Sequence, residues 1–158
     1  MRDDTVTAYL GRLAERTAAP AGGATAAVNA AQAAALLAMT ARCCDGPARA
    51  GHAETIGEVI GEADRLRYAC VALMAVGRLL ELARTPQPMV NRYIAPDVAA
   101  AAEATRAAIA TSRTNMEANL AGITDPAARD RLTRVITGTA ALEAGAEQVI
   151  AAVRAGYA

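Results

Sequence analysis

The sequence predicts an all-α fold: a compact bundle of five to six helices around a buried, alanine-rich central helix, in a single domain spanning residues 1–158. Apolar residues make up 54% of the chain, whereas aromatic residues make up only 3%. Alanine fills much of the apolar share; it is the best helix former and gives strands little to bury. Elsewhere, apolar residues recur every three or four positions, the spacing of a helix face.

The first two helices flank a glycine-rich turn. The first is expected from Asp4 to Thr17, capped by Asp3 or Asp4. Its apolar stripe comprises Val6, Tyr9, Leu10 and Leu13. The second is expected from Ala24 to Cys44, where Asp45-Gly46-Pro47 ends it.

The third helix is expected to begin near Ala53 and to extend to Arg84 unless it breaks at Gly57, Gly61 or Gly77. Its heptad-like stripe consists of Ile56, Val59, Ala63, Leu66, Cys70, Leu73, Gly77 and Leu80. A stripe of this length exceeds what a 158-residue monomer readily covers. We therefore expect a homodimer.

The last two helices are separated by a short turn. One is expected from Pro96-Asp97 to about Ala121. The other opens at Thr124-Asp125-Pro126, a capping residue followed by proline in the first turn. Its inward residues are expected to be Leu132, Val135, Ile136, Leu142, Val149, Ile150 and Val153.

Charge and cysteine content narrow the function classes. The net charge is +0 and the basic residues form no cluster, which argues against a nucleic-acid partner. The three cysteines make a poor disulfide framework, and the single histidine offers no metal-ligand spacing. We expect a cytoplasmic protein without a bound metal.

The uncharged run from Ala24 to Ala41 admits two interpretations. It is long enough to span a membrane, yet it contains Thr25, Asn29 and Gln32 and is rich in alanine rather than leucine. A helix that is apolar all round is more simply the buried centre of a bundle. We therefore expect no membrane association.

The turn Pro20-Ala21-Gly22-Gly23-Ala24-Thr25 is the first candidate binding segment. Glycines allow a ligand to approach the backbone, and a helix N-terminus carries partial positive charge. Gly22, Gly23 and Thr25 are therefore candidate substrate-binding residues. The alternative is a tight turn in which the glycines serve sterics alone.

Further candidates lie around the fourth helix. Asn91 and Asp97 flank its start, and Asp97 has the alternative role of stabilising the helix N-terminus. Ser112, Asn115 and Asn119 share one face and suit either a polar ligand or a dimer seam. Asp64, in the third helix, is a second candidate carboxylate whose alternative is a solvated surface position.

Two blocks of sequence resemble the cyclodeaminase/cyclohydrolase family, the helical domain of formiminotransferase-cyclodeaminase and its free-standing relatives. One block runs from Tyr9 to Ala27 and contains the glycine turn before an alanine-rich helix. The other combines Asn91, Asp97 and Asn115-x-x-x-Asn119-Leu120. The resemblance implies an all-α homodimer and folate chemistry without a metal or other cofactor, with a folate derivative as substrate.

The sequence departs from the family pattern in two places. Ala21 stands where the family has the first glycine of a triplet. The region between the blocks is shorter, and the family's Asp followed by Ala-Phe has no counterpart in a chain without phenylalanine. Asp64 is the nearest substitute, so the chain is expected to be a shortened, divergent member.

The leading functional hypothesis is a small-molecule enzyme acting at a C–N centre, as a cyclohydrolase or cyclodeaminase on a tetrahydrofolate one-carbon derivative. Asp97 is the first candidate general acid–base and Asp64 the second. A cyclase in specialised metabolism and a non-catalytic helical dimer remain alternatives. Because Asp97 and Asn119 lie roughly 33 Å apart on one helix, we expect a pocket at the subunit boundary, lined by Gly22-Gly23 of one chain and by fourth-helix residues of the other.

Overall fold

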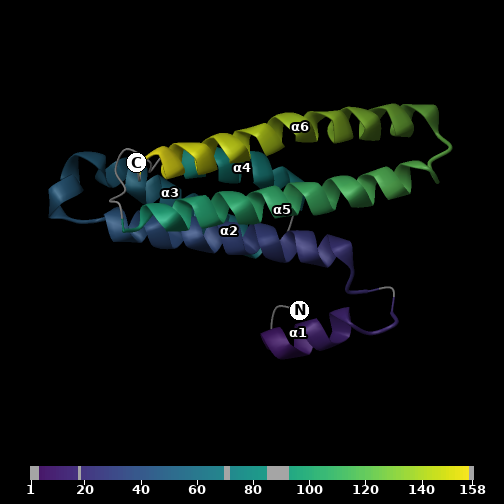
Figure 1. The fold of residues 1–158 in the computed structure, drawn as a ribbon, viewed down its shortest axis with the longest axis horizontal. Helices are drawn as coiled ribbons and strands as arrows, with labels where there is room; N and C mark the ends of the chain where they lie inside the picture. Colours follow the sequence, from purple (N-terminus) through teal and green to yellow (C-terminus); the bar gives the residue numbers. More distant parts are fainter. Residues whose placement is uncertain (1–3, 18, 70–71, 85–92, 157–158) are drawn as a thin grey trace.

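The computed structural model describes residues 4–17, 19–69, 72–84 and 93–156, and within these ranges it is helical with no strand (Figure 1). This confirms the all-α prediction. In chain order the elements are α1 (Val6–Leu13), α2 (Gly22–Cys44), the short 3₁₀ helix η1 (Pro47–His52), α3 (Ala53–Ala69), α4 (Ala72–Arg84), α5 (Ala95–Leu120) and α6 (Pro126–Ala155).

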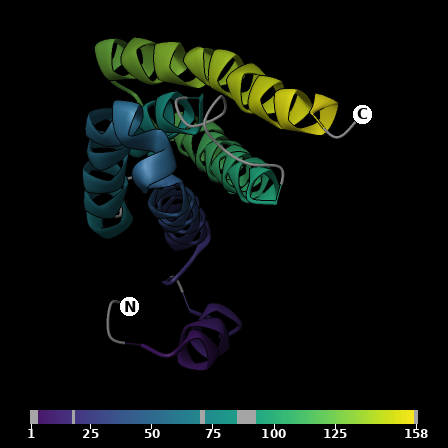
Figure 2. The same ribbon diagram turned by 90° about the vertical axis from the view of Figure 1, so that its left-hand side faces the viewer.

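Helix α2 is the central helix, as predicted. It packs along its length against α5 and α3 and also contacts α4 (Figures 1 and 2). Ala33, Ala34 and Leu37 are completely buried, and within residues 24–41 only Gln32 is exposed. By length and composition α2 is apolar enough to cross a membrane. In this fold its apolar surface forms the core, and its many alanines allow neighbouring helices to approach closely.

Capping residues explain several helix boundaries. Asp125 accepts a hydrogen bond from the Ala128 N–H at 2.9 Å, and Pro126 follows in the first turn, as predicted. Helix α1 is shorter than predicted at both ends: Thr5 rather than Asp3 or Asp4 caps its start by accepting from the Ala8 N–H, and the helix ends at Leu13 instead of Thr17. Asp4 instead forms an ion pair with Arg12.

The single long helix predicted from Ala53 to Arg84 is instead two helices, α3 and α4. None of the three predicted break points is used, since each glycine lies inside a helix. The seam residues Ile56, Val59, Ala63 and Leu80 are buried within one chain. These four residues are therefore covered by the protein's own helices, whereas Cys70 and the side chain of Leu73 lie outside the described part of the chain, and the expected homodimer stays a prediction.

Helices α5 and α6 form a long antiparallel hairpin that extends beyond the N-terminal end of α2 (Figure 1). Val135, predicted to point inward, is 47% exposed and lies in the first third of α6, the part next to the turn of the hairpin. Helix α1 lies apart from the bundle, on the side of α2 away from α6 (Figures 1 and 2), and none of its residues is buried.

Candidate functional site

The first turn of α2 lies directly against the side chain of Asn115 on α5. A Cβ built on Gly22 would lie 2.8 Å from Asn115 Oδ1 and 2.9 Å from Nδ2. No side chain beyond a hydrogen atom fits there without moving the amide. Nothing lies within 4 Å of the corresponding position at Gly23, which faces open space. Of these two glycines, Gly22 is therefore the one that packing inside the protein requires to be glycine.

The N-terminus of α2 has unsatisfied backbone donors. Its N-cap is Ala21, which provides no side-chain acceptor. The first intrahelical bond from this end runs from the Thr25 N–H to the Ala21 carbonyl at 3.1 Å. The N–H groups of Gly22, Gly23 and Ala24 thus have no partner within the helix and carry its partial positive charge. Such an end is suited to an anionic or carbonyl oxygen.

Helix α5 places three polar side chains near the N-terminus of α2, and their exposure increases along the helix. Ser112 is buried (6% exposed), Asn115 is half-buried and Asn119 is exposed. In the described part of the chain, neither the Ser112 hydroxyl nor the Asn115 side-chain amide forms a hydrogen bond. Spacings of three and four residues place all three on the side of α5 that faces Gly22. Their donors and acceptors are available to a ligand.

The two candidate carboxylates lie at the opposite end of the bundle. Asp97 is in the first turn of α5, about 27 Å along the helix from Asn115. Asp64, on α3, forms an ion pair with Arg42, which lies about 30 Å along α2 from Gly22. Within one chain neither carboxylate reaches the glycine turn.

The remaining sequence-predicted residues divide as follows. Thr25 lies in the first turn of α2, where its hydroxyl donates to the Ala21 carbonyl at 3.5 Å. Asn91 lies outside the described residues. Antiparallel packing of α2 on α5 brings Gly22 and Asn115 together within one chain, so this contact needs no second subunit. The pocket expected at a subunit boundary stays a prediction.

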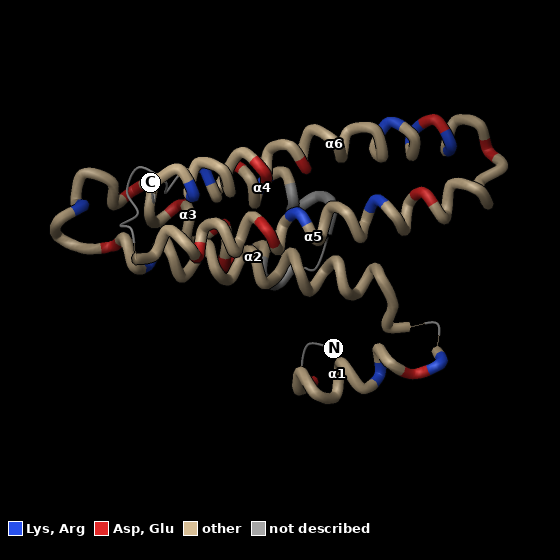
Figure 3. Tube along the Cα trace, viewed as in Figure 1, with Lys and Arg blue, Asp and Glu red and all other residues tan. Residues whose placement is uncertain are grey.

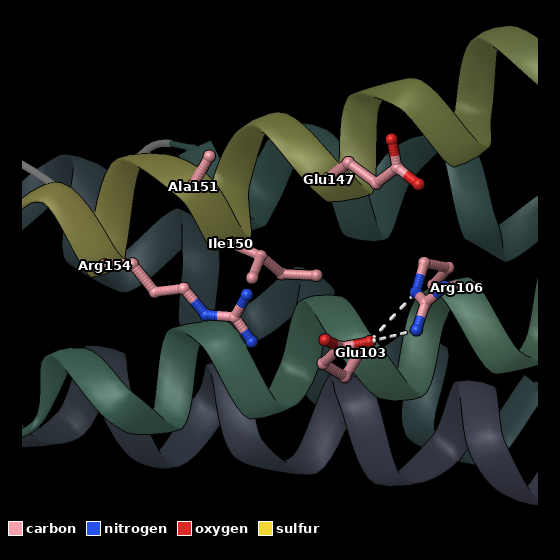
Figure 4. A pocket seen from close by; sticks show the side chains of 6 residues that line it. All are labelled: Glu103, Arg106, Glu147, Ile150, Ala151 and Arg154. Atoms are coloured by element: carbon pink, nitrogen blue, oxygen red, sulfur yellow. Dashed lines mark hydrogen bonds and ion pairs between the residues drawn. The ribbon is translucent and has the colours of Figure 1, made fainter.

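A separate groove of about 530 Å³ opens between α5 and α6 (Figure 4), a feature that sequence reasoning missed. Glu103 and Arg106 form an ion pair at 2.8 Å on one wall. The lining residues are Glu103, Arg106, Glu147, Ile150, Ala151 and Arg154. Its nearest wall lies about 14 Å along α5 from Asn115, so it is distinct from the glycine-turn site.

The glycine-turn site and the groove differ in the charge of the helices around them. Helix α2 is uncharged from Gly22 until Arg42 near its end, whereas charged residues are spread along α5 and α6 (Figure 3). On α5, Arg113 bonds to Glu117 at 2.8 Å, and this contact raises the pKa of the Arg113 guanidinium. Within the described ranges no group of His, Cys, Asp and Glu residues could hold a metal ion.

Comparisons with known proteins connect this geometry to one family. A model of the formiminotransferase-cyclodeaminase family matches residues 5–76 and 73–138, which together cover most of the chain. The two matched segments meet inside the region where the sequence departs from the family pattern. A comparison with curated protein sequences finds no significant match.

A solved structure has the same fold. Formiminotetrahydrofolate cyclodeaminase from Thermotoga maritima superposes with a TM-score of 0.83 at 17% sequence identity. The match covers 99% of this chain and 98% of that chain. The helical fold of this chain is therefore the fold of that protein.

Proposed function

Because the chain belongs to the formiminotransferase-cyclodeaminase family, we propose that it is an enzyme of one-carbon folate chemistry that acts at a C–N centre. Its specific reaction is the cyclisation of formiminotetrahydrofolate with loss of ammonia. The observation that carries this proposal is the junction of Gly22 with Asn115, where an uncapped helix N-terminus meets an unbonded amide.

Cyclisation fits the site better than hydrolysis of a methenyl bridge. Hydrolysis requires a water molecule activated by a base. Asp97 lies about 27 Å along α5 from Asn115, and Asp64 pairs with Arg42 at the far end of α2. Cyclisation carries its nucleophile, the N10 nitrogen, within the substrate. A site that supplies orientation alone lowers the barrier of such an intramolecular step substantially.

The step balances without a cofactor. In the protonated formimino form, N10–H attacks the formimino carbon and forms the new N10–C bond. The bond from that carbon to the terminal nitrogen breaks, and the N10 proton is transferred to the departing nitrogen. The products are the methenyl cation and ammonia.

Each residue of the site has a proposed task. The free N–H groups of Gly22, Gly23 and Ala24 bind an anionic or carbonyl oxygen of the substrate. The Asn115 carbonyl oxygen accepts a hydrogen bond from the formimino N–H. The Ser112 hydroxyl, which can both donate and accept, passes the proton between the nitrogens. Asn119 and Thr25 are proposed to contact the outer part of the substrate.

We also propose that the protein is a homodimer in the cytoplasm. Val6 and Leu10 of α1 and Val135 of α6 are exposed in a single chain, and a second subunit would cover apolar side chains of this kind.

The proposal is tested by following methenyltetrahydrofolate and ammonia formation from formiminotetrahydrofolate. Asn115→Ala and Ser112→Ala should each reduce kcat about tenfold or more, the effect of one lost hydrogen bond of this kind. Thr114→Ala, on the exposed opposite face of α5, is the matched control and should retain activity. Opening of methenyltetrahydrofolate, without release of ammonia from formiminotetrahydrofolate, would identify a cyclohydrolase instead. Binding of formiminotetrahydrofolate without turnover would refute catalysis.

A further inference from the structure

The groove between α5 and α6 has an acidic end, an apolar middle and a basic end. Glu147 and Arg154 of α6 both line it. A spacing of seven residues places them on one face of the helix, about 10 Å apart along its axis. Ile150 and Ala151 lie between them and form the apolar part of the lining (Figure 4). The α6 wall therefore presents one charge of each sign on either side of an apolar surface.

The two charged residues of this wall have no partner within the described part of the chain. Neither Glu147 nor Arg154 forms an ion pair or a hydrogen bond there, and both are exposed. On the opposite wall, Glu103 and Arg106 pair with each other at 2.8 Å and so neutralise each other. Figure 4 shows the Arg154 side chain extending from α6 toward α5. The charges that a ligand would meet unpaired are thus those of Glu147 and Arg154.

The neighbouring part of the hairpin shows how such a gap is closed. One turn before Glu147, Glu143 forms an ion pair across the two helices with Arg113, at 3.6 Å. Arg106 lies on the same face of α5 as Arg113, and its charge would suit a second such pair with Glu147. Arg106 instead bonds to Glu103 on its own helix. The groove therefore opens where pairing across the two helices stops.

The lining disfavours ligands that carry charge of one sign or none. A dianion in contact with both arginines would also face both carboxylates. An uncharged apolar ligand would cover charged groups without bonding to them, which is unfavourable. The volume of about 530 Å³ falls within the range typical of small-molecule sites. A ligand with one charge of each sign and an apolar middle is complementary to the α6 wall.

We propose that this groove binds a short zwitterionic peptide with free termini. Its carboxylate pairs with Arg154, whose guanidinium can donate two parallel hydrogen bonds to it. Its ammonium group pairs with Glu147, and an apolar side chain in its middle lies on Ile150 and Ala151. An extended chain spans about 3.3–3.6 Å per residue, so three residues match the separation of about 10 Å between the two charged residues. This site is separate from the glycine turn, and the proposal does not depend on folate turnover.

The test is a titration of ¹⁵N-labelled full-length protein with the tripeptide Gly-Leu-Gly, followed by amide NMR spectra. Saturable shifts are expected at Arg106, Ile150 and Arg154, whereas the amides around Gly22 should not move. The same peptide with an acetylated N-terminus and an amidated C-terminus lacks both charges and should bind about tenfold more weakly. Free glycine, whose charges are too close together to reach both ends, should also bind more weakly. No saturable shift at about 10 mM Gly-Leu-Gly would overturn the site.

Charge-removing variants test the two ends separately. Arg154→Gln and Glu147→Gln should each weaken Gly-Leu-Gly binding about threefold, the effect of one exposed ion pair. Both side chains are exposed, so the fold should be retained. Arg134→Gln and Asp130→Asn remove exposed charges of α6 outside the groove and are the matched controls. Equal weakening in all four variants, or equal binding of the blocked peptide, would overturn the proposed pairing. Turnover of formiminotetrahydrofolate, measured on the same variants, should be unchanged.

Discussion

Gly22 and Asn115 are matched in size at the contact between α2 and α5: the amide of Asn115 occupies the space that a Cβ at position 22 would need, at 2.8 Å from Oδ1. The glycine is not required for an unusual backbone, since no glycine of the described chain has positive φ. It is required because the amide must lie over the end of the helix. The pair thus links a helix start to a side chain 93 positions later in the sequence.

Gly22→Ala should push the Asn115 amide aside and reduce turnover of formiminotetrahydrofolate about tenfold or more. The loss of stability should stay within about 1 kcal/mol, because the end of a flexible side chain can move and alanine favours the helix. Steady-state kinetics and thermal unfolding measure the two effects. Gly57→Ala, inside α3 and with nothing within 4 Å of its Cβ, is the matched control and should leave turnover intact. Equal losses in both variants would contradict the role of the contact.

The helical class and the central position of α2 were predictable because they depend on local properties. The absence of charge between Ala24 and Ala41 and the abundance of alanine are both read directly from the chain. The capping residue Asp125 followed by Pro126 likewise acts over one helical turn. Such signals need no knowledge of which helices meet.

The unpredicted features depend on tertiary arrangement. A heptad-like spacing does not reveal where a helix ends, so α3 and α4 were expected as one helix. Val135 has the spacing of a core residue, yet the hairpin extends past its neighbours at that level. The Gly22–Asn115 contact requires the antiparallel register of α2 on α5, and the same register leaves Asp97 at the far end.

Asp97→Asn should leave turnover within about twofold of wild type if Asp97 acts only on the N-terminus of α5. The lost interaction with the helix dipole should cost about 0.3–1 kcal/mol of unfolding free energy. Initial rates and denaturant titration of the same preparation measure both quantities. A large loss of kcat in a fully folded variant would instead show that Asp97 reaches the chemistry, which within this fold requires a second subunit.

Thr40→Val should stabilise the protein by about 1 kcal/mol or more. Thr40 is completely buried on α2, and within the described residues its hydroxyl has no hydrogen-bond partner. Burying an unsatisfied hydroxyl is unfavourable, and valine has nearly the same shape. Chemical denaturation measures the change. Thr105→Val is the contrasting variant: that hydroxyl donates to the Ala101 carbonyl at 2.8 Å, so its removal should not stabilise. Stabilisation of both variants by the same amount would point to hydrophobicity alone.

Cys44 should make the folded state less stable as the solution becomes alkaline. Burial raises the pKa of the Cys44 thiol, so the folded chain holds this proton more tightly than the unfolded chain does. The stabilising contribution is therefore complete below the unfolded pKa of about 8.5 and falls as the pH rises above it. Unfolding free energies measured between pH 7 and 10 should decrease less steeply in Cys44→Ala than in wild type.

In the native protein at pH 8, iodoacetamide should label Cys43 well before Cys44, because Cys43 is exposed and Cys44 is only 3% exposed. Peptide mass spectrometry locates the label. Equal labelling of the two neighbouring thiols would contradict the buried position of Cys44 at the end of α2.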